Sequence, residues 1–189
     1  MIVFTTERLL VRHLEDDDFE ALYALCSDPE VTQYMGDNNP LTSEQTAEWI
    51  KTSQKNYLHQ GYGCFAITSR PAGPLIGFGG LVRTHDSTGA EIIYAFSRSS
   101  RGHGLATEFS RAMLAAGFEH WHLPRIEATI DPRNTASIRV IEKLAMTFVR
   151  SGVDEHNLPT LFYALENPAL HDRESKPYGS DVRDISLDA

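Results

Sequence analysis

The segment from residue 98 to 108, RSSRGHGLATE, contains the residue types and spacing that most directly suggest chemistry. Two arginines, Arg98 and Arg101, accompany two glycines, Gly102 and Gly104, between an apolar run and a helical pattern. A glycine-rich turn at the start of a helix presents free backbone N–H groups and the positive end of the helix dipole to an anion. The segment therefore predicts a phosphate-binding loop built mainly from main chain, with arginine charge beside it.

The neighbouring sequence ranks the phosphate ligands that such a loop could hold. A nucleoside triphosphate loop would carry a lysine followed by serine or threonine at the helix start, and this segment has no lysine. A dinucleotide loop would follow a parallel strand, with a ribose-binding acid about 20 residues later. Gly102, Gly104 and Thr107 match it loosely, and Glu127 lies at a suitable distance. Because a meander precedes the loop and Glu127 falls early in its own run, an NAD(P) site is the less favoured alternative.

A third pattern fits this loop better and extends to two other blocks. RGHGLA, residues 101–106, resembles the R/Q-x-x-G-x-G/A pyrophosphate loop of the GNAT superfamily of acyl-CoA-dependent N-acetyltransferases. IDPRNTASIRVIEKLAM resembles the D-x-x-N-x-x-S-x-x-x-x-E-K-L-G-[MF] segment of its RimJ/RimL-type branch, the ribosomal-protein N-acetyltransferases. TERLLVRHLEDDDFEALYALCSDPEV resembles the opening strand and helix of that branch. The resemblance runs from about Thr6 to Leu165.

The resemblance implies where acetyl-CoA lies. It places the molecule in a V-shaped gap between the runs EIIYAFS and RIEATID, with the pyrophosphate on the loop backbone and Arg98 at its edge. The acetyl carbonyl would accept a strand N–H between Tyr94 and Phe96. The implied cofactor-binding residues are Phe96, Arg101, Gly102, His103, Gly104, Leu105, Ala106, Thr107, Asn134 and Ser137.

Asn134 and Ser137 occupy the N-x-x-S positions, which the resemblance places near the pantetheine arm and the sulfur. An amide can hold the amide-rich pantetheine, and a hydroxyl can hydrogen-bond the departing thiolate, which would make Ser137 catalytic. The simpler alternative is that Asn134 caps a helix beginning at Thr135 and Ser137 lies in its first turn. Asn134 can do both.

Direct transfer needs a base that neutralises the attacking amine. Glu91 opens a strand at the place where many members of this family carry a glutamate, so we predict that it is the catalytic base. The alternative is an exposed charge at a strand edge. His156 and Glu155, in a later loop, are reserve candidates for the same role.

Two residues depart from the branch pattern. Ile93 stands where E-I-G-Y has glycine, and its side chain is expected to narrow the acceptor pocket or change its target. Ala145 stands where E-K-L-G has its helix-ending glycine, where a left-handed residue is less favourable with a Cβ.

The elements that position these residues follow from hydrophobic periodicity and turn signals. The order β-α-α-β-β-β-α-β-α-β-β predicts an α/β (α+β) fold of the GNAT type: a mixed, mostly antiparallel central sheet of about seven strands flanked by about four helices. The predicted strands are residues 8–14, 63–70, 74–83, 91–97, 125–131, 146–154 and 160–166, and the predicted helices are 15–28, 42–58, 105–123 and 135–145.

Length and composition indicate one N-acetyltransferase domain, residues 1–166, followed by a polar tail, residues 167–189, expected to be mobile. The formal net charge of −9 argues against nucleic acid and anionic membranes as partners. No signal peptide or membrane-length apolar run is evident, so we expect a cytoplasmic protein. Cys26 and Cys64 lack a metal-ligand spacing and are expected to be inert thiols, and HWH, residues 120–122, lacks a third ligand, so no metal is expected.

The sequence thus predicts an acetyl-CoA-dependent N-acetyltransferase that acts on a primary amine by direct attack in a ternary complex. The acceptor is a protein N-terminal α-amine or a small amine or amino-acid derivative, held by the first two helices and the loops THDSTG (residues 84–89) and EHNLP (residues 155–159). The alternative is an acyl-CoA-binding sensor with weak catalysis. Either a monomer or a homodimer fits this prediction.

Overall fold

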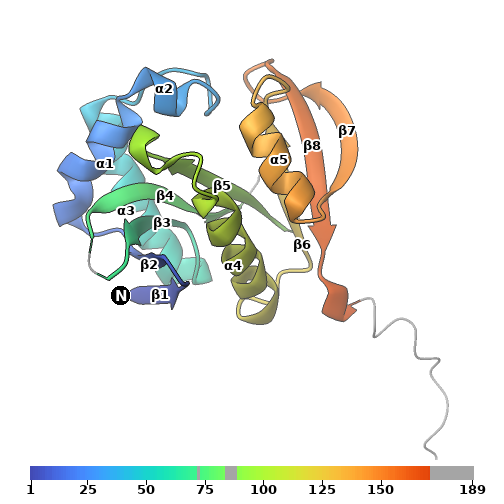
Figure 1. The fold of residues 1–189 in the computed structure, drawn as a ribbon, viewed down its shortest axis with the longest axis horizontal. Coiled ribbons are helices and arrows are strands. Elements are labelled where there is room, and N and C mark those ends of the chain that lie inside the picture. Colours follow the sequence, from blue (N-terminus) through green and yellow to red (C-terminus); the bar gives the residue numbers. More distant parts are fainter. Residues whose placement is uncertain (72, 84–88, 171–189) are drawn as a thin grey trace, which may run out of the picture.

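The computed structural model describes residues 1–71, 73–83 and 89–170. They form one eight-stranded sheet with helices on both faces, in the strand order β1-β2-β3-β4-β5-β6-β8-β7 (Figure 1). The strands are β1 (Ile2–Thr5), β2 (Leu9–His13), β3 (Cys64–Ser69), β4 (Leu75–Val82), β5 (Ala90–Phe96), β6 (Arg125–Ile130), β7 (Thr147–Val153) and β8 (Pro159–Glu166).

The helices in the described residues are α1 (Phe19–Cys26), α2 (Pro29–Thr32), α3 (Ser43–Gln60), α4 (Leu105–Glu119) and α5 (Thr135–Lys143), with 3₁₀ turns at Asp16–Asp18 and Arg98–Ser100. The fold class is confirmed, with one strand and one helix more than the sequence indicated. The extra strand, β1, has only four residues, which is too short for alternation to reveal it, and it pairs antiparallel with β2. The extra helix, α2, is a single turn begun by Pro29.

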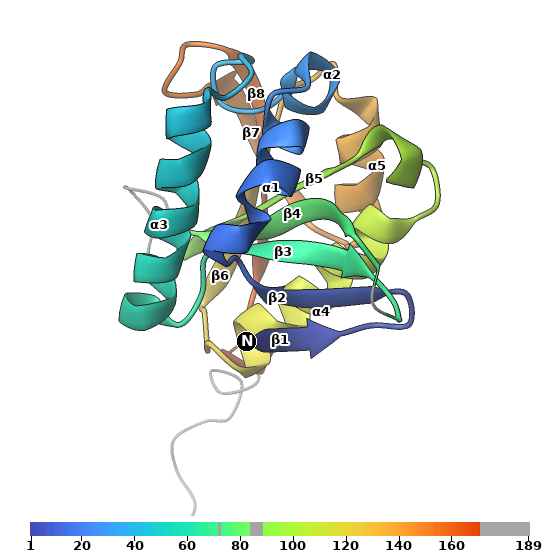
Figure 2. The same ribbon diagram turned by 90° about the vertical axis from the view of Figure 1, so that its left-hand side faces the viewer.

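Two hydrophobic cores lie on opposite faces of the sheet. Helices α4 and α5 cover the face that contains Ile92 and Phe96, whereas α1 and α3 cover the face that contains Phe78 and Ala95 (Figure 2). Because side chains alternate along a strand, Glu91 shares the α1–α3 face with Ala95. The predicted base therefore lies on the face opposite α4.

Strands β5 and β6 are parallel and separate from each other after a short contact. They pair only at Ala90–Ile126 and Glu91–Glu127. Beyond that point β5 stays paired with β4 as far as Phe96, and β6 stays paired with β8 as far as Ile130. A V-shaped gap therefore opens between the two runs, where the family resemblance implied it.

The C-terminal boundary differs from the predicted one. Asn167, assigned to the tail, is buried and donates from Nδ2 to the carbonyl oxygen of Leu123 at 2.9 Å. A polar sequence does not reveal such a buried amide, because its partner is a loop carbonyl distant in sequence. The rest of the predicted tail, residues 171–189, lies outside the described residues, as do residues 84–88 of the predicted acceptor hairpin.

Three further expectations bear on the class of protein. Cys26 and Cys64 are buried and free, as predicted, and burial raises the pKa of the Cys26 thiol to about 12. Within the described ranges, no helix has the length and apolar character to cross a membrane. Among the same described residues, no three or more His, Cys, Asp or Glu side chains are grouped so that they could hold a metal ion.

Candidate active site

The loop between β5 and α4 owes its shape to two glycines. Gly102 and Gly104 have φ angles of 77° and 78°, in the left-handed region that side chains disfavour. A Cβ at Gly102 would meet nothing within 4 Å, and one at Gly104 would meet only the Arg8 side chain, at 3.8 Å. Backbone conformation, rather than packing, therefore requires glycine here, and the loop remains open to a ligand.

The first turn of α4 presents unused donors. Its first helical bond runs from the N–H of Glu108 to the carbonyl of Gly104, at 3.1 Å. The N–H groups of Leu105, Ala106 and Thr107 have no acceptor among the described residues. Three parallel donors at the positive end of a 15-residue helix are thus open to an anion.

The two arginines of this loop bind protein groups. Arg98 forms a bidentate pair with Asp28, at 2.8 and 2.9 Å, and contacts Glu30 at 2.9 Å. Arg101 donates to the backbone carbonyls of Phe96 and Glu30, each at 3.1 Å. Both side chains therefore fasten the loop to the start of α2, whereas the sequence suggested that they add charge for phosphate. His103 is exposed, and its carbonyl accepts from Arg8 at 2.8 Å.

Asn134 and Ser137 lie at the start of α5. The Asn134 side chain accepts from the N–H of Ser137 at 3.1 Å, which confirms it as the helix cap. The Ser137 hydroxyl lies 2.8 Å from the hydroxyl of Tyr94 on β5. Burial raises the pKa of Tyr94 to about 12, so this phenol stays protonated at neutral pH. From the sequence, Tyr94 is a candidate only for a backbone N–H that binds the acetyl carbonyl. Nothing in the residue spacing indicates the contact of its side chain with Ser137.

Glu91 lies where β5 and β6 separate. It is half-buried, and its carboxylate accepts hydrogen bonds from the N–H of Thr129, at 3.2 Å, and from the Thr129 hydroxyl. Burial raises the pKa of Glu91, and the nearby Glu127 and Glu155 add to this effect, while Thr129 opposes it. An exposed charge at a strand edge would have neither this burial nor this partner.

The reserve bases lie farther out, in the turn between β7 and β8. His156 and Glu155 are both exposed, with 3.6 Å between the imidazole Nε2 and the carboxylate. Within the described chain, no hydrogen bond joins either residue to Glu91. The geometry therefore favours Glu91 over them.

The segment after α2 faces the C-terminal half of the sheet. The Arg133 guanidinium lies 5.8 Å from the ring centre of Tyr34. Hydrogen bonds from Asn39 lower the pKa of Asp37, and the charge of His156 lowers it further. One of the predicted acceptor segments, residues 155–159, thus lies on the same side of the molecule as the region around α2 (Figure 1). Ile93 is half-buried there and packs into the core under α1 and α3.

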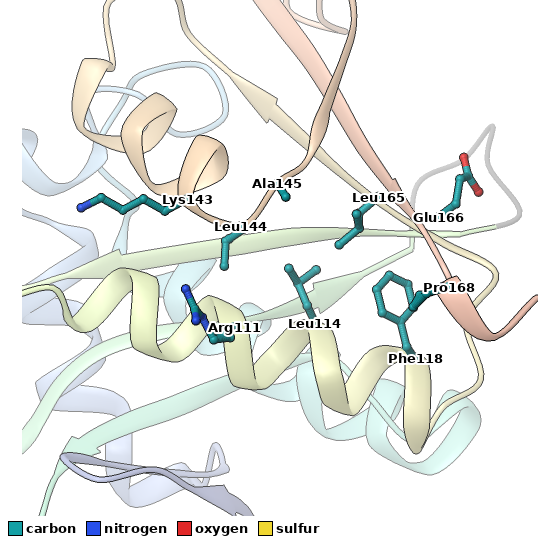
Figure 3. Close-up of a pocket in the computed structure, with 9 residues that line it drawn as sticks. All are labelled: Arg111, Leu114, Phe118, Lys143, Leu144, Ala145, Leu165, Glu166 and Pro168. Carbon is teal, nitrogen blue, oxygen red and sulfur yellow. The ribbon is translucent and has the colours of Figure 1, made fainter. Parts of the chain in front are cut away.

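A groove of about 370 Å³ lies between the C-terminal halves of α4 and α5 (Figure 3). It is separate from the gap between β5 and β6, and Ala145 on its wall has a φ of 57°. This residue adopts the left-handed conformation despite its Cβ. The groove is lined by Arg111, Leu114, Phe118, Lys143, Leu144, Ala145, Leu165, Glu166 and Pro168.

The dinucleotide alternative does not fit this architecture. Among the described strands, β5 and β6 form the single parallel pair, and an antiparallel meander leads into the loop. Glu127, the candidate ribose acid, accepts instead from the Arg125 guanidinium at 2.9 Å.

Comparison with known proteins identifies related chains. The family described as "Acetyltransferase (GNAT) domain" matches residues 8–147. YkkB of Bacillus subtilis (strain 168), an uncharacterized protein, is 35% identical over 162 residues, which cover 84% of this chain and 92% of YkkB. A GNAT-family acetyltransferase from Bacillus anthracis has a TM-score of 0.76 at 28% identity, covering 88% of this chain and 99% of that one.

A more distant similarity concerns the predicted branch. The structure of RimL, the ribosomal L7/L12 α-N-protein acetyltransferase in complex with coenzyme A, has a TM-score of 0.75 and covers 89% of this chain and 99% of RimL. The identity is 16%, so this likeness shows a shared fold.

Proposed function

Because the chain belongs to the GNAT acetyltransferase family, which matches its residues 8–147, we propose that it moves acetyl from acetyl-CoA to a primary amine by direct attack in a ternary complex. It is an N-acetyltransferase by family. This mechanism is proposed from two neighbouring features. The first turn of α4 has N–H groups without an acceptor, and a gap opens beside it between β5 and β6.

Acetyl-CoA fits the residues that surround this gap. The N–H groups of Leu105, Ala106 and Thr107 would hold the pyrophosphate, with Gly102 and Gly104 giving it access to the backbone. The pantetheine arm would lie between β5 and β6, within reach of Asn134. When bound, acetyl-CoA supplies an acetyl group activated as a thioester.

Two side chains and one backbone N–H would assist the transfer. Glu91, in its ionised form, would accept the proton of the attacking amine as the N–C bond forms. Ser137, with its hydroxyl against that of Tyr94, would donate a hydrogen bond to the sulfur as the C–S bond breaks. An N–H of β5 between Tyr94 and Phe96 would bind the carbonyl oxygen.

For the acetyl acceptor, we propose a class of amines rather than one compound. The carboxylates of Glu91, Glu127 and Asp37 favour a cationic amine over an acidic one. The likeness to RimL supports a protein N-terminal α-amine, and a small amine or amino-acid derivative remains the other member of the class. We place the reaction in the cytoplasm, where acetyl-CoA is available.

Two measurements test the proposal. Calorimetric titration should show that CoA binds and NAD(P) does not, and CoA at a hundredfold excess over its dissociation constant should stabilise the fold by about 2.7 kcal/mol. Thiol release from acetyl-CoA should then depend on one class in a panel of peptides, polyamines and amino-acid amides. Absence of CoA binding would refute the proposal. Binding without release for any amine would instead support the acyl-CoA sensor.

A further inference from the structure

Glu108, in the first turn of α4, is held by the turn between β1 and β2. Its carboxylate accepts from the Thr6 hydroxyl at 2.5 Å and from the N–H of Arg8 at 2.9 Å. The Arg8 Nε donates to the other carboxylate oxygen at 2.6 Å. The Glu108 side chain is only 17% exposed. One carboxylate thus fixes the start of α4 to a segment about one hundred residues earlier in the chain.

Arg8 also reaches the loop itself. Its Nη1 donates to the carbonyl of His103 at 2.8 Å, between the two left-handed glycines. This bond fixes the orientation of the peptide between His103 and Gly104, next to the open donors of α4. Arg8 therefore contacts both the loop and the helix that the loop begins.

The turn that carries Arg8 is itself well anchored. The Thr6 hydroxyl accepts from the N–H of Leu9 at 3.1 Å, and the Thr6 N–H donates to the Leu9 carbonyl at 2.9 Å. The Arg70 guanidinium donates to the Thr6 carbonyl at 2.6 Å. The β1–β2 turn is therefore a rigid support rather than a loose loop.

The ion pair between Arg8 and Glu108 also affects the charge near the proposed anion. Glu108 lies one residue beyond the three N–H groups that face the proposed anion, so an unpaired carboxylate there would repel a phosphate. Arg8 neutralises it with an ion pair, and the distance from Arg8 Nη2 to Glu108 Oε2 is 2.6 Å. Removing Arg8 would release the loop carbonyl and also expose the negative charge.

We propose that Arg8 and Glu108 are positioning residues that preset the pyrophosphate loop, with Arg8 also cancelling the charge of Glu108. This inference rests on the proposed function, because it assumes that CoA binds at the loop. It gives a role to the TER sequence at residues 6–8, whose contribution the resemblance to known acetyltransferases leaves open.

A second ion pair, on the strand β2 that follows this turn, provides a matched control. Arg12 forms a bidentate pair with Asp18, both distances being 2.6 Å, and touches no part of the β5–α4 loop. Arg12→Ala therefore removes an arginine from β2 and breaks a comparable ion pair, but leaves the loop intact.

The experiment measures CoA and pantetheine affinity by calorimetry for the wild type and four variants. We expect Arg8→Ala to weaken CoA binding about tenfold, and Arg8→Lys and Glu108→Gln about threefold. The double variant Arg8→Ala/Glu108→Gln should bind CoA more tightly than Arg8→Ala, because it no longer carries the unpaired carboxylate. Pantetheine, which lacks the pyrophosphate, should bind all variants equally.

Hydrogen exchange in the ligand-free protein provides a readout independent of binding. The amides of residues 101–107 should exchange faster in Arg8→Ala and at the wild-type rate in Arg12→Ala. If Arg8→Ala does not fold, the exchange rates of Arg8→Lys and Glu108→Gln are compared with that of Arg12→Ala instead.

The outcomes separate the inference from the function on which it rests. If the wild type binds CoA and the Arg8 and Glu108 variants bind it equally well, the positioning role is wrong. The same holds if pantetheine affinity falls as much as CoA affinity, since that loss would reflect general damage. If the wild type itself does not bind CoA, the proposed function fails, and the inference fails with it.

Discussion

The hydroxyl groups of Tyr94 and Ser137 lie 2.8 Å apart and connect strand β5 to helix α5. These two elements flank the gap between β5 and β6, so the contact ties one side of the gap to the other. Both residues are half-buried. Because the Tyr94 phenol keeps its proton, the pair can direct one hydroxyl hydrogen toward a bound sulfur.

Ser137→Ala should therefore reduce turnover more than cofactor binding. We expect kcat to fall about 10- to 100-fold, with the Kd for CoA within about twofold of wild type, as for a group that acts in the transition state. Tyr94→Phe should cause a smaller loss. Thr135→Ala, an exposed position in the same helical turn, is the control. Equal losses in kcat and in CoA affinity would assign Ser137 a binding or structural role.

Substitution of Gly104 should separate backbone strain from charge. Gly104→Asn and Gly104→Asp introduce side chains of the same shape at a φ of 78°, so each should cost about 1 kcal/mol of stability. The aspartate should bind CoA at least about tenfold more weakly than the asparagine, because it places a carboxylate beside the proposed pyrophosphate. Equal CoA affinities for the two folded variants would place the anion elsewhere.

Glu91→Gln should lower activity and alter the pH dependence of stability. A carboxyl whose pKa is raised on folding holds its proton more tightly in the folded chain, so its ionisation destabilises the fold. This loss begins near the ordinary glutamate pKa of about 4.3 and is complete above the raised value. Relative to wild type, Glu91→Gln should therefore be more stable at pH 8 than at pH 4, as measured by urea unfolding.

The same substitution should remove the acid limb of the kcat/KM profile. In the wild type this limb should lie above the ordinary glutamate range, because the pKa of Glu91 is raised. An unchanged pH profile in Glu91→Gln would mean that another group is the base. His156→Ala is the matching test of the reserve candidate, and we expect it to retain the limb.

Ala145→Gly should stabilise the protein. Ala145 has a φ of 57°, where glycine has no Cβ penalty, so the gain should be about 1 kcal/mol. Ala115, exposed in the middle of α4, provides the opposite case, and Ala115→Gly should cost about 1 kcal/mol. Urea unfolding of both variants gives the comparison. A loss of stability in Ala145→Gly would contradict the conformational explanation.

Ile93→Ala should change the acceptor kinetics and not the cofactor affinity. Ile93 lies on the same face as Glu91, so trimming it should enlarge the acceptor side and alter the KM of the amine. We also expect a stability loss of about 1–3 kcal/mol, since the side chain is half-buried. Ile92→Ala, on the opposite face, should lose stability without altering the amine KM. Parallel kinetic effects in the two variants would exclude a specific role for Ile93.

Local sequence patterns predicted much of the fold. The meander β3–β4–β5 and the helix α4 lie where period-2 runs, period-3.6 runs and glycines indicated. The gap between β5 and β6 lies where the family resemblance implied it. The cap at Asn134 was likewise visible, because capping depends on residues three positions apart. Such features are encoded within a few neighbouring residues.

Contacts between distant segments were not predictable in this way. Arg98 and Arg101 looked like phosphate ligands because a local pattern cannot show that Asp28 and Glu30 lie beside them. The contacts of Glu91 with Thr129 and of Tyr94 with Ser137 depend on how β5 lies against β6 and α5. Side-chain partners of this kind follow from tertiary packing.

The bond between the Arg8 N–H and Glu108 spans 100 residues of sequence. Joining ends so far apart costs loop-closure entropy, which the intervening hairpins offset by bringing the two segments together. A fragment that begins after β2 would keep both loop glycines and all of α4, yet would lack Thr6 and Arg8. The geometry of this loop thus depends on the first two strands and the turn between them as much as on the glycines.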